Sequence, residues 1–334
     1  MNERWVVSAY LRVGWRAGHL EFASASSGAT LRSDDLDLAR LLHAFARPRT
    51  IDEVLGELAG ACQLPLRARI DDLIRAGMLT PASEREAAAA HRWEASALAY
   101  HRQSRRSGFV KTHAQATPAA ATRPVDDPIT LIRGGMTTGR DFTDVVEARR
   151  SWRSWPPVPV SFEIFSAFLW LSARDRDTAG EDRDCISRPY PSGGAAYSLE
   201  LYPVIAERAV ARIAAGLYRY LPELHGLDRV TDVRADFMPF LEAAARSAGT
   251  IPPPLLFLIT SSFAKQSASY GELAYSLVLK EVGCLFQTFY LVAEYLGLAA
   301  CALGGGAPAA VLAHLNDTSE LAEPLVGEFM LGPR

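Results

Sequence analysis

The sequence predicts an α+β protein that is divided into two domains. Residues 255–260 form a continuous apolar run, which is typical of a strand covered on both faces. Residues 270–297 carry apolar side chains at helical spacing, and residues 114–128 are rich in alanine, threonine and proline, like a linker between domains. A chain of 334 residues is long enough for two hydrophobic cores. The predicted boundaries are a smaller domain over 1–110, a linker over 111–144 and a larger domain over 145–334.

The composition excludes several classes of protein. The formal net charge of −3 provides no basic footprint for nucleic acid. The four cysteines are scattered without the spacing of a zinc site, and such sparse use fits a reducing cytoplasm. The N-terminus lacks the apolar core of a signal peptide, and the longest apolar run, 252–260, is too short to span a bilayer. We therefore expect a cytoplasmic protein with no metal, nucleic-acid or membrane site.

The N-terminal domain has the element order of a winged helix. Weak alternation in residues 1–32 predicts short strands, and apolar spacing predicts a helix over 36–45. Thr50 and Glu53 form a capping box that begins a second helix. A third helix is predicted from 66 to a glycine at 77, before a short apolar strand.

Winged helices often bind DNA, but the third helix argues against this function. It offers Arg67, Arg69 and Arg75, yet Asp71 and Asp72 lie among them. A helix that reads DNA is expected to be more uniformly basic. The alternative is a module that docks an extended peptide by adding it as a strand to a sheet edge beside a helix groove.

A cluster of basic residues near the start of the second domain indicates an anion site. Arg149, Arg150 and Arg153 surround Ser151 at the end of a predicted helix. Three guanidinium groups within five residues repel one another unless an anion lies among them. Arginine also binds phosphate in a bidentate manner that lysine cannot reproduce. The alternative is a solvated basic turn.

Two glycine segments would bring backbone N–H groups close to a ligand. In the first, two prolines stiffen the approach to a Ser-Gly-Gly turn within residues 188–197, and the second follows Leu303. Such segments suit a flat or anionic cofactor, although a plain turn is the alternative for the first one. The residues proposed to contact the cofactor are Pro191, Ser192, Gly193, Gly194, Gly304 and Gly305.

Four segments occur in an order that resembles a known family. They are Ala148–Arg153, similar to the RRSxR motif that opens nitroreductases; Arg188–Gly194, similar to RPYPSGG; Gly216–Tyr220 with His225–Leu227, similar to GLYxY…HxL; and Tyr270–Tyr275 with Lys280–Gln287, similar to YGxxAY…EVGHxxQN. The family is the SagB/ThcOx-type dehydrogenases of the nitroreductase superfamily. The resemblance covers about residues 145–334.

The resemblance implies a fold, a cofactor and a reaction. The expected fold is a central, mainly antiparallel sheet flanked by helices, preceded by a smaller winged-helix-like domain that docks a leader-bearing peptide. The expected cofactor is FMN rather than FAD, since no GxGxxG begins a strand–helix unit. The expected reaction is the oxidation of thiazolines or oxazolines in ribosomal peptides during antibiotic maturation. A homodimer and a complex with a cyclodehydratase are implied as well. The resemblance adds Gln287 and Arg334 to the cofactor-binding residues.

The resemblance also implies a catalytic base, and here the sequence departs from the family pattern. Relatives use a Lys-Tyr pair, but Ser269 stands before Tyr270. Tyr270, Tyr275 and the nearby Lys280 are the catalytic candidates, with Lys265 as a second lysine. At the start of a helix, the dipole would favour the ionised form of Tyr270.

Two further departures lie in the long helix. Cys284 replaces the family's histidine, and Thr288 replaces its asparagine. The second hypothesis is therefore a catalytically divergent protein that keeps the fold and docks a peptide or a partner synthetase.

Overall fold

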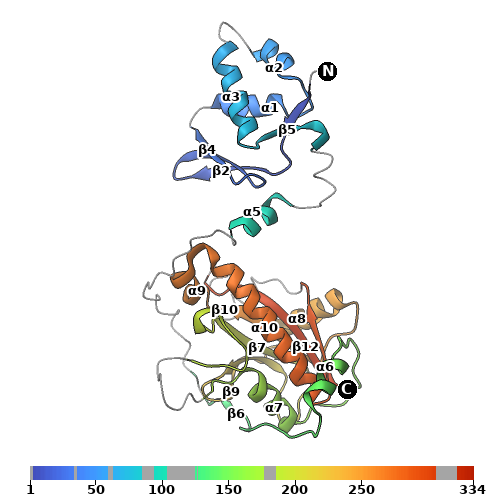
Figure 1. Cartoon of the computed structure of the whole chain (residues 1–334). Coiled ribbons are helices and arrows are strands. Elements are labelled where there is room, and N and C mark those ends of the chain that lie inside the picture. The colour runs from blue at the N-terminus through green and yellow to red at the C-terminus, as the bar shows by residue number, and fades with distance from the viewer. Residues whose placement is uncertain are drawn as a thin grey trace. The chain divides into compact units, whose positions relative to one another are not determined.

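A computed structural model of the chain describes residues 3–33, 36–58, 63–84, 94–103, 125, 127–176, 186–305 and 322–334 (Figure 1). The chain divides into two compact units, Met1–Phe109 and Val110–Arg334. Most of the predicted linker at 114–128 lies outside the described residues.

The N-terminal unit combines short strands and helices around a small core. The core contains Phe22, Phe45, Ile70 and Met78. Its elements are β1 (Trp5–Val7) paired with β5 (Leu79–Pro81), the antiparallel sheet β2 (Leu11–Arg16), β3 (His19–Ser24) and β4 (Thr30–Ser33), and the helices α1 (Leu36–Ala44), α2 (Ile51–Leu58), α3 (Gln63–Arg75) and α5 (Ala95–Gln103).

The predicted capping box and helix ending are present. Thr50 N donates to Glu53 Oε2 at 2.9 Å, and Glu53 N donates to Thr50 Oγ1 at 3.2 Å. Gly77 has φ +65°, the left-handed conformation that ends a helix at low cost. The third helix begins at Gln63, three residues earlier than the sequence predicted.

The C-terminal unit contains a seven-stranded sheet of order β11-β12-β10-β7-β8-β9-β6, in which every pairing is antiparallel. The strands are β6 (Ile129–Thr130), β7 (Leu199–Ile205), β8 (Gly216–Leu221), β9 (Gly226–Thr231), β10 (Leu255–Ser261), β11 (Leu298–Leu303) and β12 (Leu325–Pro333). The helices are α6 (Phe142–Ala148), α7 (Phe162–Ala173), α8 (Arg234–Ala248), α9 (Phe263–Tyr270) and α10 (Ala274–Tyr295), with single turns at η1 (Gly193–Ala195) and η2 (Gly271–Leu273).

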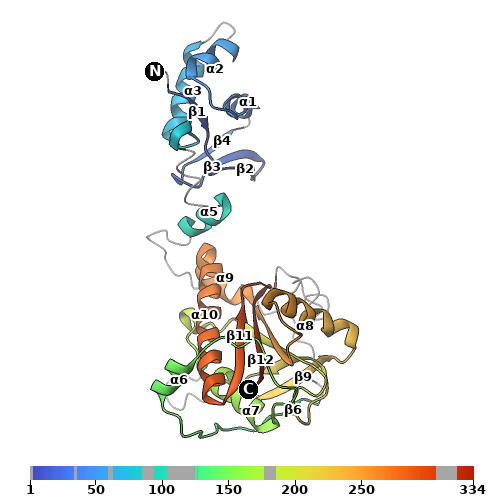
Figure 2. The same ribbon diagram turned by 90° about the vertical axis from the view of Figure 1, so that its right-hand side faces the viewer.

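Helices cover both faces of this sheet, with α10 on one face and α8 on the other (Figure 2). Side chains alternate along β10, so Phe257 packs with Phe168 of α7 and Phe289 of α10, at ring centroid distances of 5.5 and 5.4 Å. Leu258 points to the other face and joins the cluster around Phe240 of α8. The continuous apolar run therefore belongs to a central strand covered on both sides.

The prediction of one helix over 270–297 is wrong at the start of that range. Tyr270 ends α9, and Gly271 has φ +49°, which the α-helix cannot accommodate. The turn η2 follows, and α10 begins only at Ala274. Tyr270 is therefore both the last residue of α9 and the residue that precedes η2, which leads into α10.

By length and composition, one helical stretch among the described residues, 263–295, could cross a membrane. It is interrupted at Gly271, and Val278, Leu285 and Phe289 of α10 are buried in the core beside the sheet. These contacts place one face of α10 in the protein core.

Candidate functional site

The basic cluster lies where α6 ends and the chain passes beside β11. Trp152 N donates to Ala300 O at 2.8 Å, which fixes this segment against the strand. The guanidinium carbon of Arg149 lies 5.1 Å from the Tyr290 ring centroid, and that of Arg150 lies 5.5 Å from the Trp152 ring centroid. Aromatic faces thus orient two of the three guanidinium groups.

The donor set of this cluster fits an anion such as phosphate. Among the described residues, no carboxylate forms an ion pair with Arg149, Arg150 or Arg153. Trp152 Nε1 is buried and also lacks an acceptor within the described parts of the chain. Positive groups without a carboxylate, next to a buried donor, form a site to which a phosphate would supply the missing charge and acceptors.

Tyr290 connects this cluster to the strand that leads to the second glycine segment. Its hydroxyl accepts from Ala302 N at 2.8 Å and lies 2.8 Å from Ser151 Oγ. Gly304 and Arg153 line one pocket of about 400 Å³. The structure thus brings together Arg149, Arg150, Ser151, Arg153 and Gly304 of the predicted residues. Gly305 follows directly, and Ser247 Oγ donates to its carbonyl oxygen.

Arg334 lies beside the cluster but is already paired. Its Nη1 donates to both carboxylate oxygens of Glu294 at 2.8 Å, and its guanidinium carbon lies 4.5 Å from the Trp152 ring centroid. Arg140 Nη2 lies 2.9 Å from Glu294 Oε1. Burial would raise the pKa of Glu294, but the hydrogen bonds from Arg334 and Arg140 outweigh it and lower this pKa. Glu294 therefore joins α10 to the end of β12 and to the segment before α6.

The Ser-Gly-Gly turn packs against the other end of α10. Gly194, Ala195 and Tyr197 all have positive φ, of 63°, 54° and 42°. Two of these are not glycine, and a strained backbone of this kind must be held by its surroundings. Ser192 Oγ accepts from Tyr197 N at 2.9 Å, so the hydroxyl faces the turn itself.

A buried carboxylate, Glu281 of α10, forms hydrogen bonds to residues of this turn and beside it. Glu281 Oε2 accepts from Ser198 Oγ at 3.2 Å and from Gln266 Nε2 at 3.3 Å, and Ser192 also hydrogen-bonds to Glu281. Glu281 Oε1 and Gln266 Oε1 are buried without a partner among the described residues. Burial raises the pKa of Glu281, and the hydrogen bonds offset only part of this effect.

One copy of the chain does not bring the two glycine segments together. Gly193 lies against Leu277, since a Cβ added there would be 3.6 Å from its side chain, whereas Ser151 contacts Tyr290. Leu277 and Tyr290 are thirteen positions apart on α10, or about 20 Å along its axis. The two groups of predicted cofactor residues therefore lie near opposite ends of this helix.

The catalytic candidates lie near the turn end of α10. Tyr270 is half-buried, Lys280 is exposed, and Tyr275 packs edge-on against Phe263 at 6.4 Å between ring centroids. Tyr275 and Lys280 are five positions apart, hence about 140° apart around α10, and do not share a face. Lys265 Nζ lies 3.4 Å from Glu200 Oε1. Gln287 is exposed on α10.

The model of the nitroreductase family matches residues 146–332, more than half of the chain. The chain belongs to the nitroreductase family. Membership identifies it as an oxidoreductase and confirms the predicted fold, a mainly antiparallel sheet flanked by helices.

Curated relatives of this nitroreductase-family chain include one archaeal and two bacterial proteins. MJ1384 of Methanocaldococcus jannaschii, which is named as a nitroreductase, is 30% identical over 161 residues, or 48% of this chain and 77% of the relative. The microcin B17-processing protein McbC of Escherichia coli is 27% identical over 44% of this chain and 55% of McbC. The trifolitoxin-processing protein TfxB of Rhizobium leguminosarum is 26% identical over 54% of this chain. The chain spans about half the length of McbC and TfxB, at 55% and 49%.

Solved structures show the same fold. A nitroreductase-type protein from Ralstonia eutropha matches 66% of this chain and 98% of its own with a TM-score of 0.50 and 19% identity. One from Anabaena variabilis matches 71% of this chain and 47% of its own with a TM-score of 0.52 and 17% identity.

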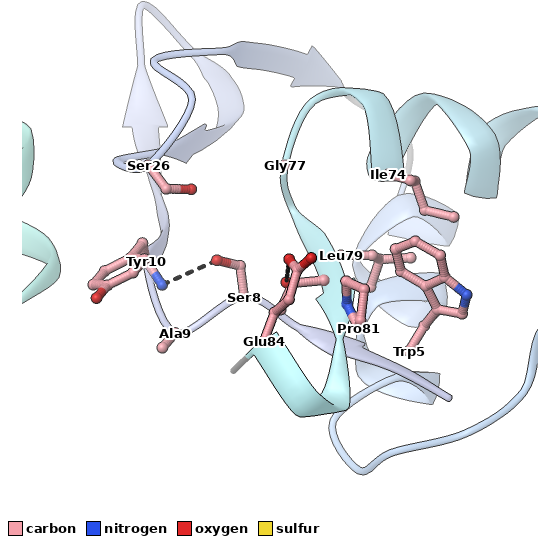
Figure 3. Close-up of a pocket in the computed structure, with 11 residues that line it drawn as sticks. Trp5, Ser8, Ala9, Tyr10, Ser26, Ile74, Gly77, Leu79, Pro81 and Glu84 are labelled. Carbon is pink, nitrogen blue, oxygen red and sulfur yellow. Dashed lines mark hydrogen bonds between the residues drawn. The ribbon is translucent and has the colours of Figure 1, made fainter. Parts of the chain in front are cut away.

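A pocket of about 430 Å³ lies in the N-terminal unit, outside the nitroreductase-family match. Trp5, Ile74 and Leu79 form an apolar wall, and Tyr10 and Ser26 lie opposite (Figure 3). Its volume lies within the usual range of small-ligand pockets, and its lining is partly apolar and partly polar.

Proposed function

We propose that the chain is an FMN-dependent dehydrogenase that oxidises thiazoline or oxazoline rings to thiazoles or oxazoles in a ribosomally synthesised peptide. The names of McbC and TfxB, both proteins that process peptide products, support a peptide substrate. The ordered RPYPSGG-like and YGxxAY-like segments support the azoline reaction. The observation that supports the flavin most strongly is the Arg149–Arg153 cluster, which has no carboxylate partner in the described structure.

The cofactor would lie with its phosphate at Ser151 and Arg153. In the bound state, FMN supplies a hydride acceptor at N5 and collects negative charge near N1. Arg149 and Arg150 would stabilise that charge, and backbone N–H groups at Gly304 and Gly305 would face N5. Tyr290 holds the Ser151 hydroxyl in place.

The substrate loses a hydride and a proton, so that a C=N-containing ring gains a C=C bond and becomes aromatic. A base must take the ring Cα proton, and Tyr270 is our candidate, assisted by Tyr275 or Lys280. A positioned general base typically contributes about 10²–10⁴-fold to the rate. Tyr270→Phe should therefore slow flavin reduction without loss of peptide binding.

The complete site would require a second copy of the chain. Tyr275, Leu279, Gly283 and Gln287 recur at every fourth position and form an exposed stripe on α10, with Leu279 40% exposed. We expect this stripe to pack against the same stripe of a second copy. Such packing would bring the Gly193–Gly194 turn of one protomer to the basic cluster of the other. Leu279→Asp should produce a monomer that loses flavin, whereas Leu224→Asp, at another exposed leucine, should not. A flavin-bound monomer of the unchanged protein in light scattering would contradict this assembly.

The N-terminal unit would dock the leader of the peptide, and a cyclodehydratase that forms the rings would be a partner. The proposed location is the cytoplasm, whose reducing conditions fit the four scattered cysteines.

Flavin binding is the first experiment. The purified protein soaked with FMN should be yellow, and Arg153→Ala should weaken the affinity at least tenfold through loss of a charge-assisted phosphate contact. Arg212→Ala is the matched control, since Arg212 is exposed and contacts Glu163 and the Phe162 ring on α7, away from the basic cluster. The proposal would be refuted if the unchanged protein, Arg153→Ala and Arg212→Ala were all colourless after soaking with FMN.

A second function is favoured by one observation. Ser269 replaces the lysine of the base pair, and the nearby Lys265 forms an ion pair with Glu200 at 3.4 Å. A protein that docks the peptide or a synthetase without oxidation would bind FMN and peptide, yet leave the flavin oxidised.

A further inference from the structure

The edge strand β2 in the N-terminal unit has backbone groups without a partner. Ala25 N donates to Tyr10 O, so Tyr10 and Ala25 form a hydrogen-bonded pair in the antiparallel register of β2 and β3. Hydrogen-bonded pairs occur at every second residue, so the backbone groups of residues 12, 14 and 16 form hydrogen bonds to β3. The N–H and C=O groups of Val13 and Trp15 therefore face outward. No described residue pairs with them.

The side chains at the same positions extend the hydrophobic core into solvent. Val13 is opposite Phe22 and Trp15 is opposite Leu20, so all four point to the core side of the sheet. Phe22 is fully buried, but Val13 is 56% and Trp15 75% exposed. Helix α5 contacts β2 and leaves both exposed. An apolar edge left open in this way favours pairing with another strand.

The opposite face of β2 is cationic. Arg12 and Arg16 alternate with Val13 and Trp15 and are exposed. Among the described residues, neither has a carboxylate within ion-pair distance, in contrast to Arg32 on β4, which pairs with Glu21 at 3.0 Å. A strand added to β2 would thus meet apolar side chains on one face and two guanidinium groups on the other.

We propose that the outer edge of β2 binds an extended peptide in which acidic and apolar residues alternate. The backbone of the peptide would pair with Val13 and Trp15, its apolar side chains would cover Trp15, and its carboxylates would meet Arg12 and Arg16. The proposal rests on the proposed peptide substrate and identifies the surface and the chemistry that would recognise it. A second copy of β2 is disfavoured as occupant because its own arginines would be brought next to Arg12 and Arg16.

The test uses the full-length protein and a fluorescent synthetic peptide that alternates glutamate with leucine, with a lysine–leucine peptide as its counterpart. Fluorescence anisotropy should show binding of the glutamate peptide only. Trp15→Ala should weaken this binding at least tenfold, the size expected of an aromatic anchor. Arg12→Glu with Arg16→Glu should abolish the preference for glutamate. Leu58→Ala and Arg40→Glu, at exposed positions on α2 and α1, are the controls and should have no effect.

Val13→Pro separates pairing from side-chain contact. Among the backbone hydrogen-bonding groups it removes only the outward N–H of Val13, so the β2–β3 ladder survives, and it replaces the valine side chain with another apolar group. Proline is tolerated on edge strands in this orientation. It should weaken peptide binding as strongly as Trp15→Ala, with an unchanged circular dichroism spectrum. Three results would each overturn the proposal. Val13→Pro could bind the glutamate peptide as tightly as the unchanged protein does, or the unchanged protein could bind both peptides equally. The unchanged protein could also be a dimer that Val13→Pro dissociates. Flavin reduction by an azoline compound, measured on the same variants, reports the proposed function separately.

Discussion

Substitution of Glu294 by glutamine tests whether the ion pairs beside the basic cluster hold the C-terminal unit together. Glu294 is 3% exposed, and its partners Arg140 and Arg334 are 32% and 33% exposed. Breaking a fully buried pair costs about 3–5 kcal/mol, and partial solvation of the two arginines reduces this to about 2–3 kcal/mol. Glu294→Gln keeps the shape and some hydrogen bonds but removes the charge.

The effect should depend on pH in a defined direction. The pKa of Glu294 is lowered in the folded protein. The ion pairs therefore stabilise the folded protein fully at pH values above 4.5, the ordinary pKa, and this stabilisation is lost as pH falls through the pKa of the folded state. The difference between wild type and Glu294→Gln should therefore be full at pH 7 and shrink below about pH 4.5. Urea-dependent hydrogen exchange of α10 amides measures the free energy of unfolding of this unit directly.

The matched control is Glu163→Gln. Glu163 pairs with Arg212 at 3.4 Å, but the two side chains are 46% and 72% exposed. Its loss should cost less than about 0.5 kcal/mol. Equal effects of the two substitutions at pH 7, or an undiminished effect of Glu294→Gln at pH 3.5, would refute the reasoning.

Three further predictions follow from other residues. Burial lowers the pKa of His225 to about 4, with Nε2 donating to Ile132 O and Nδ1 accepting from Tyr220. Its ring signals in NMR should therefore not titrate above pH 5, and the unit should lose stability as pH falls from 6.5 to 4. The raised pKa of Glu281 means that its ionisation costs stability, so Glu281→Gln should gain stability relative to wild type as pH rises above the ordinary value of 4.5. A pH-independent difference in urea unfolding would contradict this. A truncated chain that begins at Thr122 should keep FMN in a spectrum but lose affinity for a leader-bearing peptide, and unchanged peptide affinity would assign docking elsewhere.

Local features of the sequence predicted the fold and the basic cluster. Arg149, Arg150 and Arg153 are neighbours in the chain, so their proximity needs no tertiary information. The continuous apolar run of β10 and the capping box at Thr50 are also set by residues within a few positions of each other.

The supporting residues of the site could not be predicted in the same way. Tyr290 and Glu294 have the spacing of ordinary helix positions, and their partners Ser151 and Arg334 are 139 and 40 positions away in the chain. The break at Gly271 was missed because apolar periodicity continues across it, although the adjacent Tyr-Gly pair was a signal of a helix end.

The most direct measurement of the central claim is anaerobic reduction of the bound flavin by a thiazoline-containing peptide. The reconstituted protein should bleach at the flavin absorbance maximum in the stopped-flow instrument, and mass spectrometry should show that the peptide has lost two hydrogen atoms for each ring oxidised. Tyr270→Phe should bleach at least about 100-fold more slowly with the same peptide affinity. A flavin that dithionite reduces but that stays oxidised with the bound peptide would contradict azoline oxidation and favour the docking function.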